Sequence, residues 1–252
     1  MSAPRVFDLE HYEKLNTARS TVVGDLLGEV ASQVKLQTAI DVGSGLGYFS
    51  AYLHSLGLQV TAVDGRRENV EEAGHRVPQV KFHTINAEDH ALRELGQFDL
   101  VFCFGLLYHL ENPFVAARHL HALTRNLLLV ESVIFPGSEP IMALVDETSN
   151  EDQGLNHLAF YPTEACLVKL LYRVGFPNVY LFSRMPEHEH YRSRHNARQA
   201  RTMLAASQSP LLASLLQVAP EPSTEIQPWD PRSGVEKEAL LHKLRRFVRR
   251  SL

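Results

Sequence analysis

Apolar residues recur in short unbroken runs along the middle of the chain, and most runs are followed by a segment with helical spacing. The run at residues 100–104 (Leu-Val-Phe-Cys-Phe) lacks the alternation of a half-exposed strand, which is typical of a strand buried on both faces. Strand–helix units of this length predict an α/β fold, a mostly parallel sheet with helices on both faces. The expected strands are residues 38–42, 59–64, 80–86, 98–105, 126–134, 178–184 and 201–207.

Helix signals fall between these runs. Asn112 followed by Pro113 is a favoured arrangement at the start of a helix. Thr163 is placed to cap another helix, which Gly175 ends. The expected helices are residues 20–34, 48–56, 68–75, 112 onward and 163–174.

The ordered pattern predicts one domain over residues 1–210, with an inserted, irregular, lid-like segment at 135–161. Residues 211–252 are expected to form a Pro/Ser-rich linker and a basic amphipathic C-terminal helix. That helix is expected to dock on its own domain or on a partner subunit, as in a homodimer. Weak contact with an anionic membrane surface or RNA is the alternative.

Composition narrows the range of functions. The net charge is −4, which gives no general field to attract nucleic acid. Two cysteines provide neither a disulfide framework nor a metal-ligand spacing, and this suits a reducing cytoplasm. No apolar signal core or membrane span is expected.

The strongest chemical signal is the run Asp-Val-Gly-Ser-Gly-Leu-Gly at residues 41–47, between an expected strand and an expected helix. Glycines let the backbone turn sharply and approach a ligand closely. The helix start adds free N–H groups and a positive dipole end. The spacing G-x-G-x-G differs from the dinucleotide fingerprint G-x-G-x-x-G, which disfavours an NAD-dependent oxidoreductase.

Polar residues also follow the next two strands. Asp64 ends the second strand, where a carboxylate accepts hydrogen bonds from both hydroxyls of a ribose. Asn86, Ala87 and Glu88 follow the third strand, where a polar side chain and a backbone N–H are placed to bind an adenine ring. Both features indicate a ribose-bearing cofactor.

Together with the Phe-Asp-Leu-Val run at 98–101, these motifs resemble the Rossmann-like S-adenosylmethionine (SAM)-dependent methyltransferases. The resemblance implies a seven-stranded sheet whose last strand is antiparallel, and SAM as the cofactor. It implies that the SAM-binding residues are Asp41, Gly43, Gly45, Gly47, Asp64, Asn86, Ala87 and Glu88.

A narrower resemblance lies in residues 105–113, 129–132 and 161–176. These segments are similar to enzymes that modify the wobble uridine of tRNA with a carboxylated SAM, and to methyltransferases of sugars and other natural products. The acidic body of the chain and its short N-terminal segment favour a small-molecule acceptor over tRNA. A SAM-binding protein without catalysis is a third alternative.

The expected reaction is methyl transfer to a hydroxyl of a small molecule such as a sugar, with an amine as the less favoured acceptor. Transfer to a hydroxyl needs a base, and His109 just past the fourth strand is the leading candidate. Glu131, a carboxylate inside the fifth strand, is the second expected catalytic residue. The acceptor pocket is expected to include Tyr108, His157 and Arg192. The Pro-Glu-His-Glu-His run at 186–190 does not have a zinc-site spacing, so no metal is expected.

Overall fold

The computed structural model describes residues 5–192 and 200–223. The chain divides into a compact unit over Met1–Pro222 and a second unit over Ser223–Leu252. The basic C-terminal helix expected from the sequence lies outside the described residues. The part of the chain described here contains no helix long and apolar enough to cross a membrane.

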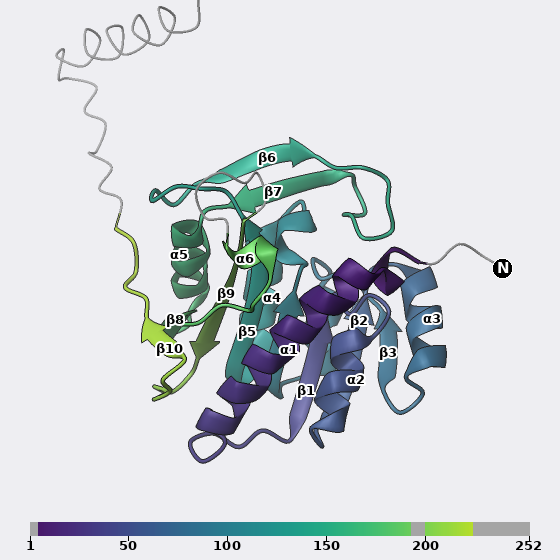
Figure 1. Ribbon diagram of the computed structural model, residues 1–252, viewed down its shortest axis with the longest axis horizontal. Helices are drawn as coiled ribbons and strands as arrows, with labels where there is room; N and C mark the ends of the chain where they lie inside the picture. Colours follow the sequence, from purple (N-terminus) through teal and green to yellow (C-terminus); the bar gives the residue numbers. More distant parts are fainter. Residues whose placement is uncertain (1–4, 193–199, 224–252) are drawn as a thin grey trace, which may run out of the picture. The chain divides into compact units, whose positions relative to one another are not determined.

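An eight-stranded sheet forms the centre of the first unit, in the order β10-β8-β9-β5-β4-β1-β2-β3 (Figure 1). Five neighbouring strands, from β3 to β5, run parallel, and β9 is antiparallel to both β5 and β8. The strands are β1 (Thr38–Val42), β2 (Gln59–Asp64), β3 (Lys81–Thr84), β4 (Phe98–Phe104), β5 (Thr124–Ile134), β8 (Asn178–Phe182), β9 (Ala200–Ser207) and β10 (Leu216–Val218).

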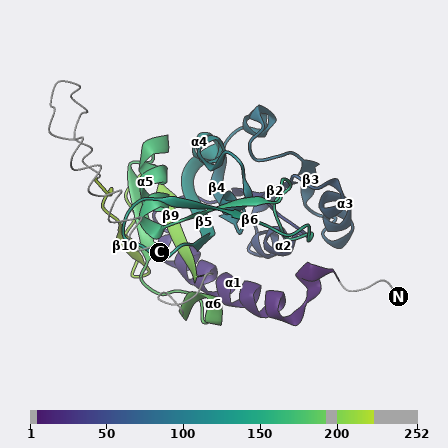
Figure 2. The ribbon, with the colours of Figure 1, turned by 90° about the horizontal axis from the view of Figure 1, so that it is seen from above.

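Helices cover both faces of this sheet, with α1 and α2 on one side and α4 and α5 on the other (Figure 2). The α-helices are α1 (Glu10–Val30), α2 (Tyr48–Ser55), α3 (Arg67–Arg76), α4 (Pro113–Leu123), α5 (Glu164–Val174) and α6 (Glu189–Arg192). The short 3-10 helices within residues 5–192 and 200–223 are η1 (Val6–Asp8), η2 (His90–Leu95) and η3 (Leu107–His109). The expected fold class is confirmed.

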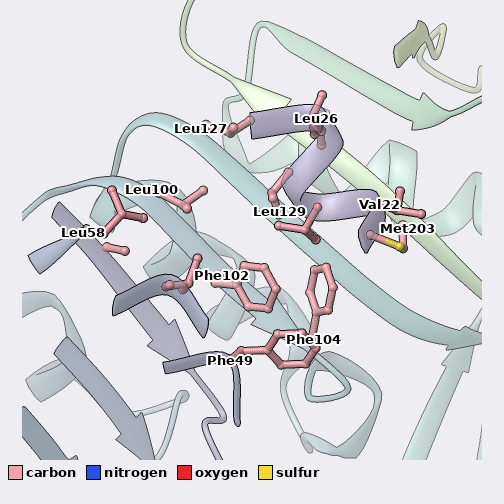
Figure 3. Close-up of a cluster of buried hydrophobic side chains, with 14 of the residues drawn as sticks. Val22, Leu26, Phe49, Leu58, Leu100, Phe102, Phe104, Leu127, Leu129 and Met203 are labelled. Atoms are coloured by element: carbon pink, nitrogen blue, oxygen red, sulfur yellow. The ribbon is translucent and has the colours of Figure 1, made fainter. Parts of the chain in front are cut away.

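The unbroken apolar run of β4 is explained by these two layers. Leu100, Phe102 and Phe104 point to the side of α1 and α2, whereas Val101 and Cys103 point to the side of α4 and α5. Figure 3 shows the first layer, in which the β4 phenylalanine rings meet Phe49 of α2. Because both faces of the strand are buried, apolar residues are favoured at every position of residues 100–104.

The structure adds elements where the sequence predicted none. β6 (Met142–Asp146) and β7 (Leu158–Pro162) form a two-stranded antiparallel sheet inside the segment expected to be irregular. Both strands are mostly apolar, but the largely polar residues 147–157 lie between them, and this polar stretch made the whole segment look irregular in the sequence. β10 pairs with β8, so the sheet has eight strands instead of the expected seven and continues past the expected boundary at residue 210. α1 begins at Glu10, ten residues earlier than expected.

Candidate active site

A cleft of about 640 Å³ lies at the carboxyl ends of the parallel strands. Its walls are the turns after β1, β2, β3 and β4, one side of α1, and the loop between β6 and β7. Ligands of open α/β sheets bind at this edge. We call residues 147–157 the β6–β7 loop.

The glycine turn after β1 has the backbone geometry that its sequence predicts. Gly43, Gly45 and Gly47 all have positive φ angles, of 82°, 52° and 86°. A side chain at these positions is strained, because L residues rarely adopt this region. The hydroxyl of Ser44 in the same turn is buried and has no hydrogen-bond partner among the described residues. It is a donor and acceptor left available for a ligand.

Replacing Gly43 by alanine is expected to weaken SAM binding at least about tenfold and to cost about 1–3 kcal/mol of stability. An added Cβ lies 2.9 Å from the Leu106 side chain, and φ is +82°. Isothermal titration and urea unfolding measure the two effects. Gly28→Ala is the control, because that exposed helical position has no atom within 4 Å of the new Cβ. Equal SAM affinity in both variants would contradict the prediction.

Asp64 lies where the sequence places a ribose-binding carboxylate. One oxygen accepts a hydrogen bond from the Gly45 N–H at 2.9 Å, and the other accepts from the Arg66 N–H at 2.8 Å. Burial raises the pKa of Asp64, although these hydrogen bonds oppose the change. The carboxylate joins the turns after β1 and β2 and lines the cleft between them.

Asn86, Ala87 and Glu88 line the cleft after β3. The Asn86 side-chain oxygen accepts a hydrogen bond from the Glu88 N–H at 3.1 Å. The Glu88 carboxylate accepts hydrogen bonds from the backbone and side chain of Asn112, at 2.7 and 2.9 Å. The turn is therefore held rigidly from two sides.

Asp41 is the one expected cofactor residue that does not line the cleft. Its side chain is buried beneath the glycine turn, and the Ser50 hydroxyl donates a hydrogen bond to it at 2.6 Å. Asp41 therefore links β1 to the first turns of α2. Burial raises its pKa to about 7, despite the opposing effect of Ser50.

Asp41→Asn is expected to flatten the pH dependence of stability. The folded protein holds the Asp41 proton more tightly than the unfolded chain does, so stability falls as pH rises from 3.8 to about 7. A tenfold difference in proton affinity between the two states corresponds to about 1.4 kcal/mol of stability. Urea unfolding across this window measures the slope. An unchanged slope in the variant would contradict the prediction.

His109 lies at the end of η3 and lines the cleft. Its Nδ1 is 2.8 Å from a carboxylate oxygen of Glu147, whose side chain is 2% exposed. The same Glu147 oxygen accepts a hydrogen bond from the Gly154 N–H at 2.9 Å. The sequence did not single out Glu147, because it lies 38 residues away in a polar segment.

Tyr108 and Arg201 form the wall beside His109. The Tyr108 and His109 rings are 4.0 Å apart, and Arg201 donates a hydrogen bond to the Tyr108 hydroxyl at 3.2 Å. Burial raises the pKa of Tyr108, so its hydroxyl keeps its proton. Tyr108 lines the cleft, as expected for a pocket residue.

Glu131 is fully buried but does not line the cleft. Arg19 approaches it at 2.8 Å, Arg201 at 3.0 Å, and the Tyr191 hydroxyl donates to it at 2.9 Å. Burial opposes its ionisation, but the two guanidinium groups outweigh that effect and lower the pKa of Glu131 to about 2. The second expected catalytic residue is thus placed as a counterion, because so weak a base is a poor proton acceptor near neutral pH.

Two further residues, His157 and Arg192, were expected in the pocket. His157 does not line the cleft; it is exposed, with φ of 57°, and its carbonyl accepts the Glu147 N–H at the closing end of the β6–β7 loop. The Arg192 side chain lies outside the described residues. Within residues 5–192 and 200–223, no three His, Cys, Asp or Glu side chains stand close enough together to hold a metal.

The β6–β7 loop covers the cleft and is tied to it at several points. Glu151 pairs with Arg5, Asp152 accepts a hydrogen bond from Tyr12, and Arg66 donates to the Gln153 carbonyl at 2.9 Å. These partners are more than 80 residues apart in sequence, so no local pattern reveals them. The only hint in the sequence was the density of acidic residues in this segment.

Comparison with known proteins agrees with this geometry. Residues 40–126 match the protein family described as Methyltransferase domain. The chain is 28% identical over 160 residues to tRNA U34 carboxymethyltransferase of Tolumonas auensis, covering 59% of this chain and 47% of that protein. It is 38% identical over 98 residues to ubiquinone biosynthesis O-methyltransferase of Xanthomonas campestris, covering 36% and 41%. The chain thus spans about half the length of these relatives.

Two solved structures share the fold. The N-terminal domain of EvdMO1, crystallised in the presence of S-adenosylhomocysteine (SAH) and D-fucose, superposes with a TM-score of 0.61 at 19% identity, covering 79% of this chain and 84% of that one. Magnesium protoporphyrin IX methyltransferase from Synechocystis with bound SAM gives 0.53 at 19%, covering 83% and 87%. With its motifs, its sheet order and the family match over residues 40–126, this chain contains a Rossmann-like methyltransferase domain of the SAM-dependent, class I type.

Proposed function

We propose that this protein transfers a methyl group from SAM to a hydroxyl group of a small molecule, with His109 as the general base. The observation that carries the proposal is that His109 lines the cleft and pairs with the buried Glu147 carboxylate behind it. A carboxylate that accepts a hydrogen bond from Nδ1 fixes the imidazole tautomer, which leaves Nε2 free to accept a proton. The relative named as an O-methyltransferase supports an oxygen acceptor.

The cleft fits the proposed cofactor. Three glycines with positive φ leave room for its amino-acid part, and the buried Ser44 hydroxyl offers an unused polar group. Asp64 is placed to accept hydrogen bonds from a ribose. The turn at Asn86–Glu88 is placed to hold the adenine. When bound, SAM supplies a methyl group already activated on a sulfonium.

The chain's own residues are proposed to remove the acceptor's proton and to shield the site. His109 takes the hydroxyl proton as the acceptor oxygen forms its bond to the methyl carbon and the carbon–sulfur bond breaks. Tyr108 and the β6–β7 loop line the site and shield part of it from solvent. We assign Glu131 the role of positioning Arg19 and Arg201, because its carboxylate does not reach the cleft.

Modification of tRNA is the second candidate, because the Tolumonas relative is a tRNA U34 carboxymethyltransferase. It predicts tight binding of tRNA that weakens steeply with salt, as the release of counterions requires. A SAM-binding protein without catalysis is the third. It predicts cofactor binding with no turnover of any acceptor.

The test is calorimetric titration of the purified protein with SAM, SAH and NAD, followed by an assay of SAH release with hydroxylated small molecules and with tRNA. We expect SAM and SAH to bind with micromolar affinity, NAD not to bind, and small hydroxyl compounds to turn over. Binding of NAD alone would overturn the proposal. Turnover with tRNA and with no small molecule would instead support tRNA modification, the second candidate function.

A further inference from the structure

Three charged side chains lie buried together where β5 and β9 meet the cleft. Arg19 of α1 and Arg201 of β9 both contact the Glu131 carboxylate, and their side chains are only 6% and 13% exposed. Both arginines line the cleft, but Glu131 does not. The positive side of this cluster therefore faces the cavity.

The charges in this cluster do not cancel. Two guanidinium groups share one carboxylate, and the other hydrogen-bonding neighbours are the hydroxyls of Tyr108 and Tyr191 and the Asn16 amide. Burial raises the pKa of both tyrosines, so they stay neutral. Within the described part of the chain, Arg19, Arg201 and Glu131 together carry one net positive charge in a buried place, and such a charge is unfavourable unless an anion pairs with it.

Among the described residues, the other acidic side chains that line the cleft bond to groups outside this cluster, and only the buried Asp152 Oδ1 is without a partner. Asp8 pairs with Arg76, Asp64 with the Gly45 and Arg66 N–H groups, Glu88 with Asn112, Glu151 with Arg5 and Asp152 with Tyr12. Guanidinium is a planar donor suited to a carboxylate. Each arginine has five N–H donors. Arg201 uses its Nη1 toward Glu131 and its Nη2 toward Tyr108.

The position of the cluster favours the acceptor as the source of the anion. β5 and β4 lie between β9 and β1, whose turn is proposed to hold the cofactor. Arg201 contacts Tyr108, and the Tyr108 ring adjoins that of His109. The positive site is therefore next to the proposed base.

We infer that Arg201, supported by Arg19 and Tyr108, binds a carboxylate of the methyl acceptor. The acceptor class is then a hydroxylated carboxylic acid, whose hydroxyl lies at His109 while its carboxylate lies at Arg201. Glu131 holds both arginines in place and leaves one positive charge for the ligand. This inference rests on the proposed function and names its substrate class.

The wild-type protein tests the inference with matched acceptors: salicylate against salicylamide, gallate against gallamide, and glucuronate against glucose. A charge-assisted hydrogen bond predicts a kcat/KM about 10- to 100-fold higher for the acids. Calorimetric binding in the presence of SAH is the second readout. If the acids bind more tightly than their neutral partners but none is methylated, the result counts against the proposed function and not against this inference. No acid preference in either readout overturns the inference.

Arg201→Gln is expected to bring the ratio of acid to neutral acceptor close to one and to leave SAM affinity unchanged. Arg67→Gln is the matched control, because the Arg67 side chain is 78% exposed on α3. Circular dichroism checks folding, and Arg201→Lys, which keeps the charge but loses the planar donor, is expected to lower the ratio in part. Weaker SAM binding with an unchanged acid preference in either variant would assign the arginine to the cofactor's own carboxylate and overturn the inference.

Discussion

Replacing His109 by alanine is expected to lower kcat about 100- to 10,000-fold while SAM binds with wild-type affinity. The acceptor hydroxyl then has no group to take its proton as the bond to carbon forms. His109 lines the cleft beside Tyr108 and belongs to none of the turns proposed to hold the cofactor. Steady-state kinetics with an acceptor that the wild-type protein methylates measure kcat. Calorimetry with SAM measures the cofactor affinity separately.

Glu147 provides an independent check on the same proposal. Glu147→Gln keeps the shape of the side chain but removes the carboxylate that faces Nδ1 at 2.8 Å. We expect a smaller fall in kcat, about 10- to 100-fold, because the base is present but poorly oriented. His90→Ala is the control, since that side chain is 75% exposed. A kcat unchanged in His109→Ala would remove His109 from the mechanism.

Glu131→Gln is expected to reduce the free energy of unfolding by about 3–5 kcal/mol, because it leaves Arg19 and Arg201 buried without their counterion. Urea unfolding at neutral pH measures the loss. Glu71→Gln is the control, because that carboxylate is 57% exposed and pairs with Arg67 of the same helix. Exposed pairs of this kind contribute less than about 1 kcal/mol.

Acid is expected to lower the free energy of unfolding of the wild-type protein, as the Glu131→Gln substitution does. The pKa of Glu131 is lowered to about 2 from 4.5, so the folded protein binds this proton less tightly than the unfolded chain. Its contribution to stability is full above pH 4.5 and is lost as pH falls toward 2. The Glu131→Gln variant is expected to lack this loss of stability, because glutamine is not protonated in this pH range. A loss below about 0.5 kcal/mol in the variant would show that the two arginines need no anion here.

Much of the fold follows from local patterns in the sequence. The apolar runs of β1, β2 and β4 predict their positions to within a residue, because buried parallel strands admit no alternation. Thr163 and Gly175 bound α5 as expected, since capping and left-handed backbone are local requirements. The glycine turn was also predictable from the local sequence, because its positive φ angles favour glycine directly.

The hairpin of β6 and β7 could not be predicted in this way. Its two short apolar strands are separated by the largely polar residues 147–157, and β7 packs against η3 and β5, which no local pattern reveals. The position of Asp41 was equally hidden. Whether a carboxylate beside a glycine turn faces the ligand or Ser50 depends on how α2 packs on β1.

The sequence by itself determined the class of fold, the glycine turn and the polar residues at the ends of β2 and β3. Each depends on neighbours close in the chain. Tertiary structure alone decided what the charged residues do: it brings Glu147 to His109 and surrounds Glu131 with arginines from α1 and β9. The reason is physical, because a buried charge is defined by its partners, and here they lie at least 38 residues away along the chain.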